Sequence, residues 1–194
     1  HFKMDSHVTQ CACSAHRSAP SVHQTLDEME FERGIWSAAL DGDLEKVRSF
    51  LRKGIDPNLR DQSHYTALHY AGRAGHLSVC MLLLDCGACV NAQTRGGATP
   101  LHRSAYCGHV RVVKVLLDRG ADPHLTDDDG TTPLHKAAEQ KHLEVCELLV
   151  NRFPVLRSQK DKRSHIPFDV CPEHNMFWEF LRPPRPDLTH SLLC

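Results

Sequence analysis

The chain has 194 residues, 41% of them apolar, and its 23 basic and 24 acidic residues leave a formal net charge of −1. This composition suffices for one domain with a sizeable core, whereas the near-neutral balance disfavours binding to nucleic acid or anionic membranes through charge. No apolar run approaches the roughly 20 residues of a membrane helix, and the polar amino terminus lacks the apolar core of a signal peptide. We therefore expect an intracellular protein, in the cytoplasm, the nucleus or both.

The beginning of the chain shows no repeating apolar pattern, and residues 1–27 are predicted to form a disordered tail. Three residues precede Met4, which makes Met4 a candidate for the true start. Cys11, Cys13 and His16 lie close together in this tail and are residue types that bind zinc, although no clear fourth ligand stands beside them. Metal binding by the tail is therefore a minor alternative function.

A 33-residue period organises the middle of the chain. The tetrapeptides that begin at Thr66, Thr99 and Thr132 read T-A-L-H, T-P-L-H and T-P-L-H, and Gly-His pairs begin nine residues after the first two, at Gly75 and Gly108. Pairs of apolar residues and Gly-Ala pairs keep the same step. Several separate anchors in one register predict a stack of similar structural units.

Each unit is predicted to contain two helices. Thr99 can cap a first helix that begins at Pro100, because proline lacks an N–H that would be unpaired there and has a helical φ. Gly108 can adopt the left-handed conformation that closes this helix. A second apolar stretch follows, in which Val113 and Leu116 fall at helical spacing on one face.

The 33-residue period and the T-P-L-H-x-A signature, complete from Thr132 to Ala137, resemble the ankyrin repeat. The resemblance implies an all-α solenoid of helix-turn-helix units joined by β-hairpin or finger loops, such as the Asp-, Pro- and Gly-rich segment 122–131. It also implies no catalytic residues and no cofactor. We therefore expect a non-catalytic protein-protein interaction module or adaptor rather than an enzyme.

The first and last units are predicted to cap the stack. In the first unit, Lys46 and Ser49 stand where later repeats have valine and leucine, which gives a terminal repeat the polar face it needs. The predicted repeats span about 28–60, 61–93, 94–126 and 127–160, followed by a degenerate cap at 161–182 and a Pro-rich tail at 183–194. The repeat domain as a whole is predicted to cover 28–182.

The last unit departs from the pattern, because its version of the signature, beginning at Ile166, carries one inserted residue. In the preceding repeat, Lys141 stands where earlier repeats have a helix-ending glycine. A non-glycine residue at positive φ costs about 1 kcal/mol. The apolar residues predicted to close the core at this end are Met176, Phe177, Phe180 and Leu181.

The resemblance implies a concave binding surface made of the finger tips and the exposed side of each first helix. Its variable positions are the candidates for partner contact, since the fold makes few demands on them. These candidates are Gln62, His64, Tyr65, Tyr70, Arg73, Arg95, Arg103, Tyr106, Asp128, Asp129, Lys136 and Glu139. Tyrosine and arginine often dominate binding energy, and an acidic segment beside apolar residues would complement this surface. We expect a monomer that binds a protein partner, without direct nucleic acid or membrane binding.

Other chemistry is less well supported. His69, His102 and His135 recur at one position of the three central repeats, which indicates architectural hydrogen bonding rather than one catalytic cluster. Cys86 and Cys89 form a C-x-x-C with no second pair at zinc spacing. The main alternative function is a nuclear transcription regulator that acts through a protein partner.

Overall fold

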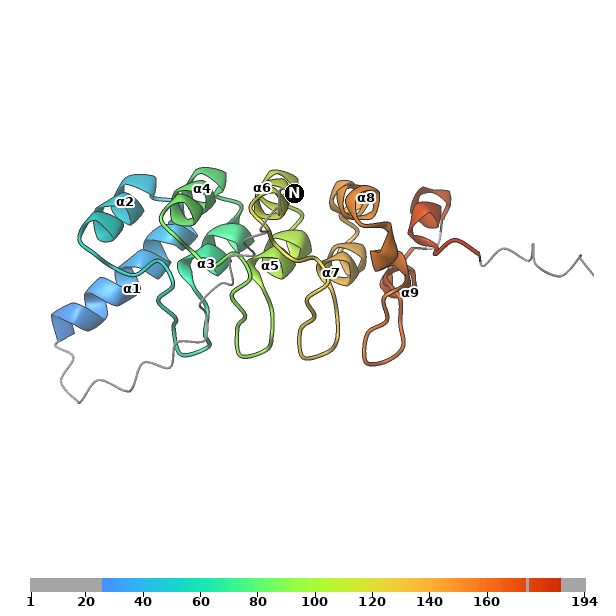
Figure 1. Cartoon of the computed structure of the whole chain (residues 1–194), viewed down its shortest axis with the longest axis horizontal. Helices are drawn as coiled ribbons and strands as arrows, with labels where there is room; N and C mark the ends of the chain where they lie inside the picture. Colours follow the sequence, from blue (N-terminus) through green and yellow to red (C-terminus); the bar gives the residue numbers. More distant parts are fainter. Residues whose placement is uncertain (1–25, 174, 186–194) are drawn as a thin grey trace, which may run out of the picture.

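The computed structural model describes residues 26–173 and 175–185, with side chains described from residue 34 onward. Within these ranges, four helix pairs and a shorter terminal unit follow one another along a single row (Figure 1). The pairs are α1 (Leu26–Asp41) with α2 (Leu44–Arg52), α3 (Ala67–Ala74) with α4 (Leu77–Asp85), α5 (Pro100–Tyr106) with α6 (Val110–Asp118), and α7 (Pro133–Glu139) with α8 (Leu143–Arg152). The terminal unit contains α9 (Pro167–Val170) between two 3₁₀ helices, η1 (Pro154–Ser158) and η2 (Met176–Leu181).

The helices form two layers. The first helices α1, α3, α5, α7 and α9 pack against one another in sequence, and the second helices α2, α4, α6 and α8 do the same. The finger loops project beyond the layer of first helices (Figure 1). The described ranges contain no β-strand, so the all-α prediction is confirmed and the fingers are hairpin-shaped turns. Cys11, Cys13, His16 and most of both predicted tails lie outside the described residues.

The predicted caps define the first helices. Thr99 and Thr132 are extended, and the hydroxyl of each accepts a hydrogen bond from the backbone N–H three residues later. Proline occupies the first helical turn in both cases, as predicted. In the terminal unit Ile166 stands in place of the threonine, and the carboxylate of Asp169 instead accepts the Ile166 N–H at 3.0 Å. This last first helix, α9, is only four residues long.

The signature histidines join neighbouring repeats. The Nδ1 atom of His102 accepts the Thr99 backbone N–H at 3.1 Å, which leaves the proton on Nε2 to donate to the Thr131 carbonyl of the next finger at 2.9 Å. His69 and His135 make the equivalent bonds. Burial lowers the pKa of His69 and His102 to about 4, and lowers that of His135. Neutral histidine is therefore part of the architecture, as predicted.

A second contact between repeats involves glycine and histidine. Gly75 closes α3 in the left-handed conformation, with φ +81°, and a Cβ at this position would lie 2.5 Å from Nδ1 of His109. His109 fills that space and bonds through Nε2 to the Arg73 carbonyl at 2.9 Å. Gly42 with His76 and Gly108 with His142 repeat this arrangement. Glycine is thus required at these junctions for two reasons: the backbone has a positive φ, and a histidine ring occupies the space of a Cβ.

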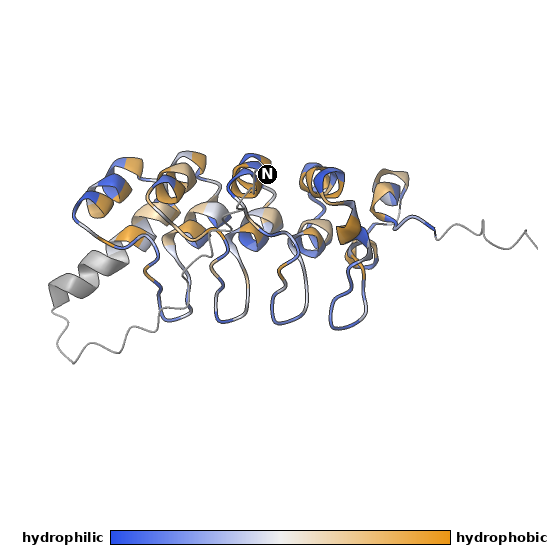
Figure 2. Ribbon diagram, in the orientation of Figure 1, coloured by the Kyte–Doolittle hydropathy of each residue, from blue (hydrophilic) through white to orange (hydrophobic). Residues whose placement is uncertain are grey.

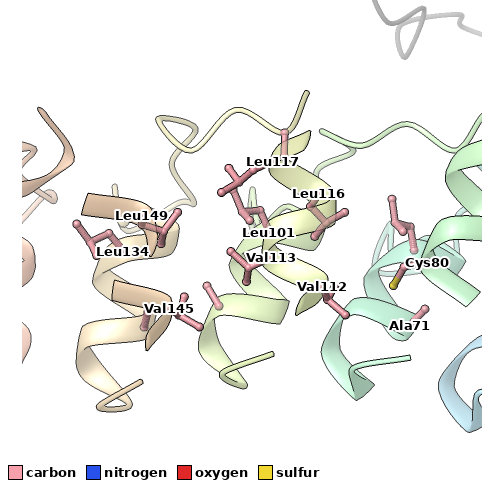
Figure 3. Close-up of a cluster of buried hydrophobic side chains, with 14 of the residues drawn as sticks. Ala71, Cys80, Leu101, Val112, Val113, Leu116, Leu117, Leu134, Val145 and Leu149 are labelled. Carbon is pink, nitrogen blue, oxygen red and sulfur yellow. The ribbon is translucent and has the colours of Figure 1, made fainter. Parts of the chain in front are cut away.

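The core runs continuously between the two layers. Figure 3 shows Val112, Val113 and Leu116 of α6 beside Leu101 of α5, all of them buried. Arg111, Lys114 and Asp118, on the other face of α6, are exposed. Figure 2 shows hydrophilic colouring along the finger loops, whereas apolar residues concentrate in the helices. Burial of each of these leucines contributes about 1.5–3 kcal/mol to the free energy of unfolding. In a stack of repeats this burial takes place within each unit and against its neighbours, so contacts between adjacent units are a main source of stability.

The terminal unit closes the core differently from the prediction. Leu181 is buried as predicted, but Met176 and Phe177 are 80% and 67% exposed, while Trp178 is only 4% exposed. The segment forms the 3₁₀ helix η2, which has three residues per turn, so that Trp178 and Leu181 share one face. The prediction that Met176 and Phe177 close the core is therefore wrong. Phe180 is half-buried against the core.

Candidate partner-binding surface

Four finger loops line one edge of the stack, and their first residues set their shape. Oδ1 of Asp61 accepts the backbone N–H groups of Ser63 and Tyr65, both at 2.9 Å. Asp127 and Asp161 do the same in their own fingers, and in the second finger the Thr94 hydroxyl accepts the Ala98 N–H. Because these inward side chains make the hydrogen bonds that define each turn, the turn does not depend on the side chains at its tip.

The fingers are joined to one another by backbone hydrogen bonds. The Arg95 N–H donates to the Ser63 carbonyl at 3.0 Å, that of Asp128 to Gly96 at 2.9 Å, and that of Lys162 to Asp129 at 3.0 Å. Each bond joins the first tip residue of one finger to the second tip residue of the finger before it. The tips therefore form one row with a fixed register, parallel to the row of first helices (Figure 1).

Five of the predicted tip candidates face solvent, whereas Tyr65 is half-buried. Gln62, His64, Arg95, Asp128 and Asp129 are exposed. His64 has φ +63°, at the position that glycine occupies in the second and third fingers. A non-glycine residue at positive φ is uncommon, and His is among the residue types that tolerate it best. These five side chains are thus available to a partner.

Tyr65, Tyr70 and Arg103, from two adjacent repeats, form an aromatic-arginine cluster. The rings of Tyr65 and Tyr70 lie 5.4 Å apart, and the guanidinium of Arg103 stacks over the Tyr65 ring at 5.1 Å from its centroid. This distance suits a cation-π interaction. The structure therefore brings together three residues that the sequence identified separately.

Hydrogen bonding fixes one side of this cluster, and the other side contains a buried donor. The Tyr70 hydroxyl donates to Oδ2 of Asp61 at 2.5 Å, and burial together with this bond raises the pKa of Tyr70 to about 12. Tyr70 is thus a neutral donor at physiological pH. On the other side, Nε of Arg103 is buried and has no hydrogen-bond partner within the described residues. A buried donor without an acceptor is costly, so this nitrogen is an unsatisfied polar group inside the cluster.

The remaining candidates lie on the first helices. Arg73, Tyr106 and Glu139 are exposed near the ends of α3, α5 and α7, and Tyr106 retains 42% of its accessible surface. Lys136 is half-buried, with Nζ 3.4 Å from the Asp127 carboxylate. Partial burial opposes ionisation of Asp127, but hydrogen bonds from Thr131 and the charge of Lys136 hold its pKa below the usual value. Lys136 is therefore already engaged in an ion pair.

Sequence reasoning missed the fourth finger, residues 161–165. Its tip carries Lys162 and Arg163, both exposed. A hollow of about 270 Å³ lies between this finger and the third, bordered by residues that include Asp129, Glu139 and Lys162. The signal was present in the sequence, because Asp161 aligns with Asp127 once the inserted residue is counted. The surface therefore does not end at the acidic third finger.

The described residues offer little for other chemistry. No group of three or more His, Cys, Asp or Glu side chains is placed to hold a metal ion in the part of the chain that the structure covers. Burial raises the pKa of Cys80 to about 12 and also raises that of Cys146, so neither forms a reactive thiolate. None of the described helices is long and apolar enough to cross a membrane.

Sequence comparisons find repeat proteins. A model described as "Ankyrin repeats (3 copies)" matches residues 35–127, and one described as "Ankyrin repeats (many copies)" matches 108–150. The chain is 57% identical over 83 residues to human ankyrin repeat domain-containing protein 39, and 61% identical over 64 residues to the Bos taurus protein of that name. These segments are 42% and 33% of this chain, and 45% and 35% of the relatives.

A third relative illustrates how such repeats occur within larger proteins. Serine/threonine-protein kinase 12 of Arabidopsis thaliana is 38% identical over 86 residues, which are 40% of this chain and 18% of that protein. The match therefore covers a small part of the kinase, whereas the two mammalian relatives each match over less than half of their length.

Proposed function

Because the chain belongs to the ankyrin-repeat family, we propose that it is a non-catalytic interaction module that binds a protein partner through the finger tips and first helices. The observation that carries this proposal is the aromatic-arginine cluster. Tyr65, Tyr70 and Arg103 are prearranged by ring contacts, by stacking between two repeats and by the bond from Tyr70 to Asp61. Prearranged aromatic and arginine side chains are typical of residues that dominate binding energy.

The proposed surface extends from this cluster in both directions. Exposed Arg73 and Tyr106 lie on the same layer of first helices as the cluster. Arg95 adds a positive charge at the second finger, and the pKa of His69 is lowered partly by the positive charges of Arg103 and Arg60. The central part of the surface is thus basic and aromatic. It suits a partner segment with acidic residues beside apolar ones.

Alanine substitution tests this proposal. We expect the triple variant Arg73→Ala, Arg103→Ala and Tyr106→Ala to lose its partner in affinity purification with mass spectrometry, whereas the wild-type chain retains it. A matched control replaces two basic residues and one large apolar residue on the other layer, Arg111→Ala, Lys114→Ala and Met81→Ala, all of them exposed. Circular dichroism confirms that both variants are folded. A partner that binds wild type, triple variant and control equally would contradict the proposal.

We also propose that the module acts as a monomer inside the cell. The nuclear alternative, regulation of transcription through a DNA-binding partner, uses the same surface and differs in compartment and partner. Fluorescence localisation of the tagged chain and light scattering of the purified protein test these statements. A stable dimer, or a chain retained outside both cytoplasm and nucleus, would contradict them.

A further inference from the structure

The charges at the finger tips alternate along the row. The first two tip positions are Gln62 and Ser63 in the first finger, Arg95 and Gly96 in the second, Asp128 and Asp129 in the third, and Lys162 and Arg163 in the fourth. The five charged side chains in this series are exposed, and none makes an ion pair or side-chain hydrogen bond within the described ranges. From the second finger to the fourth the row therefore reads positive, negative, positive.

The backbone determines the spacing of these charges. Each finger has two chain segments that face each other through hydrogen bonds, such as Asp127 N–H to the Thr131 carbonyl at 3.1 Å. Neighbouring fingers are joined by one further backbone bond of the same kind. Hydrogen-bonded segments lie about 4.8 Å apart, so equivalent tips repeat at about 10 Å. Packed helices, which are 8–10 Å apart, give a consistent spacing for the layer behind them.

This spacing matches one conformation of an extended partner. A polyproline II segment has three residues per turn and rises about 3.1 Å per residue, so side chains at positions i, i+3 and i+6 point the same way about 9 Å apart. A β-strand of the same length would turn alternate members of that set to opposite sides. A polyproline II segment can therefore present one side chain to each of three successive fingers.

A helical partner is a less suitable occupant. A helix would meet successive tips with residues about seven apart and would need an apolar groove to bury its apolar face. Among the described large apolar side chains that are exposed, only Leu40 and Tyr106 lie on the layer of first helices, at equivalent positions two repeats apart. Met81 lies on α4, and Val155, Met176 and Phe177 lie in η1 and η2 of the terminal unit. A polar surface with one exposed aromatic ring favours a segment that keeps its backbone solvated.

We propose that the partner presents an extended, polyproline II-like segment with acidic, basic and acidic residues at three-residue steps, opposite the second, third and fourth fingers. This inference rests on the proposed function and specifies its partner. The acidic residues face Arg95 and the pair Lys162 and Arg163, and the basic residue faces Asp128 and Asp129. The hollow of about 270 Å³ between the third and fourth fingers receives part of the intervening chain.

Synthetic peptides test the register directly. The matched probe is a fluorescein-labelled, proline-rich peptide with Glu, Lys and Glu at i, i+3 and i+6, and three controls change one property each: charges reversed, steps shortened to two residues, or charges placed seven apart in a helix-forming host. Binding to the full chain is measured by fluorescence anisotropy. We expect the matched peptide to bind about tenfold more tightly than the reversed one, because three exposed pairs change sign.

A charge-reversed variant provides the second measurement. Asp128→Lys with Asp129→Lys changes two exposed side chains that make no ion pair or side-chain hydrogen bond to the rest of the described chain, and should convert the preference from the Glu-Lys-Glu peptide to a Glu-Glu-Glu peptide. Equal binding of matched and reversed peptides, or tightest binding of the seven-residue spacing, would overturn the inference. Loss of a cellular partner in the triple alanine variant would still support the proposed function in that event, so the two failures are distinguishable.

Discussion

The central repeats and the terminal unit are built from related sequence but join their neighbours in different ways. Between central repeats, a histidine ring occupies the space that a Cβ on the preceding glycine would need, as His109 does at Gly75. At the last junction Lys141 has φ +60°, and its Nζ lies 2.5 Å from the Glu173 carboxylate. The side chain at this junction position thus takes part in an exposed ion pair. The backbone at this position therefore keeps a positive φ both where a glycine packs against a histidine ring and where a lysine replaces the glycine.

The largest expected effect concerns the signature histidines, which the terminal unit lacks. His69 and His102 have pKa values of about 4 in the folded chain against an ordinary value of 6.5. The unfolded chain therefore binds more protons between these values, so stability is fully present above about pH 6.5 and falls as the pH approaches 4. Each histidine lowers the free energy of unfolding by about 1.4 kcal/mol per pH unit in this window. Urea unfolding between pH 7 and 5 measures the slope.

A His102→Gln variant sharpens this expectation. It removes one titrating group from the interior, so the pH slope should decrease by about 1.4 kcal/mol per pH unit relative to wild type. An unchanged slope in the variant would show that His102 is not the proton acceptor responsible. A His124→Gln variant, which changes an exposed histidine, provides the matched control.

The next effect contrasts the core of the central repeats with the exposed side of η2. Leu101→Ala should lower the free energy of unfolding by about 3 kcal/mol, because a fully buried leucine leaves a cavity in close-packed surroundings. Phe177→Ala should change it by less than about 0.5 kcal/mol, since that ring is largely exposed. Urea titrations at pH 7.5 compare the two variants. Equal losses would mean that Phe177 belongs to the core after all.

Substitution of a junction glycine should have a somewhat smaller effect. Gly75→Ala introduces a Cβ against the His109 ring and places alanine at φ +81°. Strain and displacement of the ring together should destabilise the chain by about 2 kcal/mol. Thermal unfolding followed by circular dichroism measures the change. A Gly75→Ala, His109→Ala double variant no longer has the clash, so the destabilisation caused by the alanine itself should be smaller in that background.

The smallest effect is expected at the last junction. Lys141→Gly relieves a positive φ, and it also removes the exposed contact with Glu173. The first change stabilises by about 1 kcal/mol and the second destabilises by less, so a net gain of about 0.5 kcal/mol is expected. Lys141→Ala, which keeps the strain and loses the contact, is the control. A loss of stability in the glycine variant would contradict the assignment of strain to this residue.

Much of the fold could be predicted because its determinants are local. Threonine before proline and glycine before histidine specify helix ends within a few residues, and their recurrence at one step identifies the stack. The terminal unit was harder to predict because Met176 and Phe177 were assigned by apolar character, whereas the three-residue turn of η2 decides which side chains face inward. The apolar character of these residues does not indicate whether the helix has three residues per turn or 3.6.

The sequence predicts which positions make up the candidate site, but it does not predict the contacts between their side chains. The repeat register places Tyr70 and Arg103 on first helices, but stacking of Arg103 on Tyr65 and the bond from Tyr70 to Asp61 depend on how two repeats pack together. The fourth finger was missed for a different reason, since one inserted residue shifts its register. Its basic tip became apparent only from its backbone bond to the third finger.

The histidines at the repeat junctions hold the helix ends that carry two of the proposed contact residues. His109 bonds to the carbonyl of Arg73, and His142 bonds to the carbonyl of Tyr106, each at 2.9 Å. Pulling the two ends of the array apart would stretch these hydrogen bonds and increase the distance between neighbouring finger tips. We therefore expect tension to shorten the residence time of a bound segment before any repeat unfolds, which a force-clamp measurement on the tethered chain would reveal as faster release.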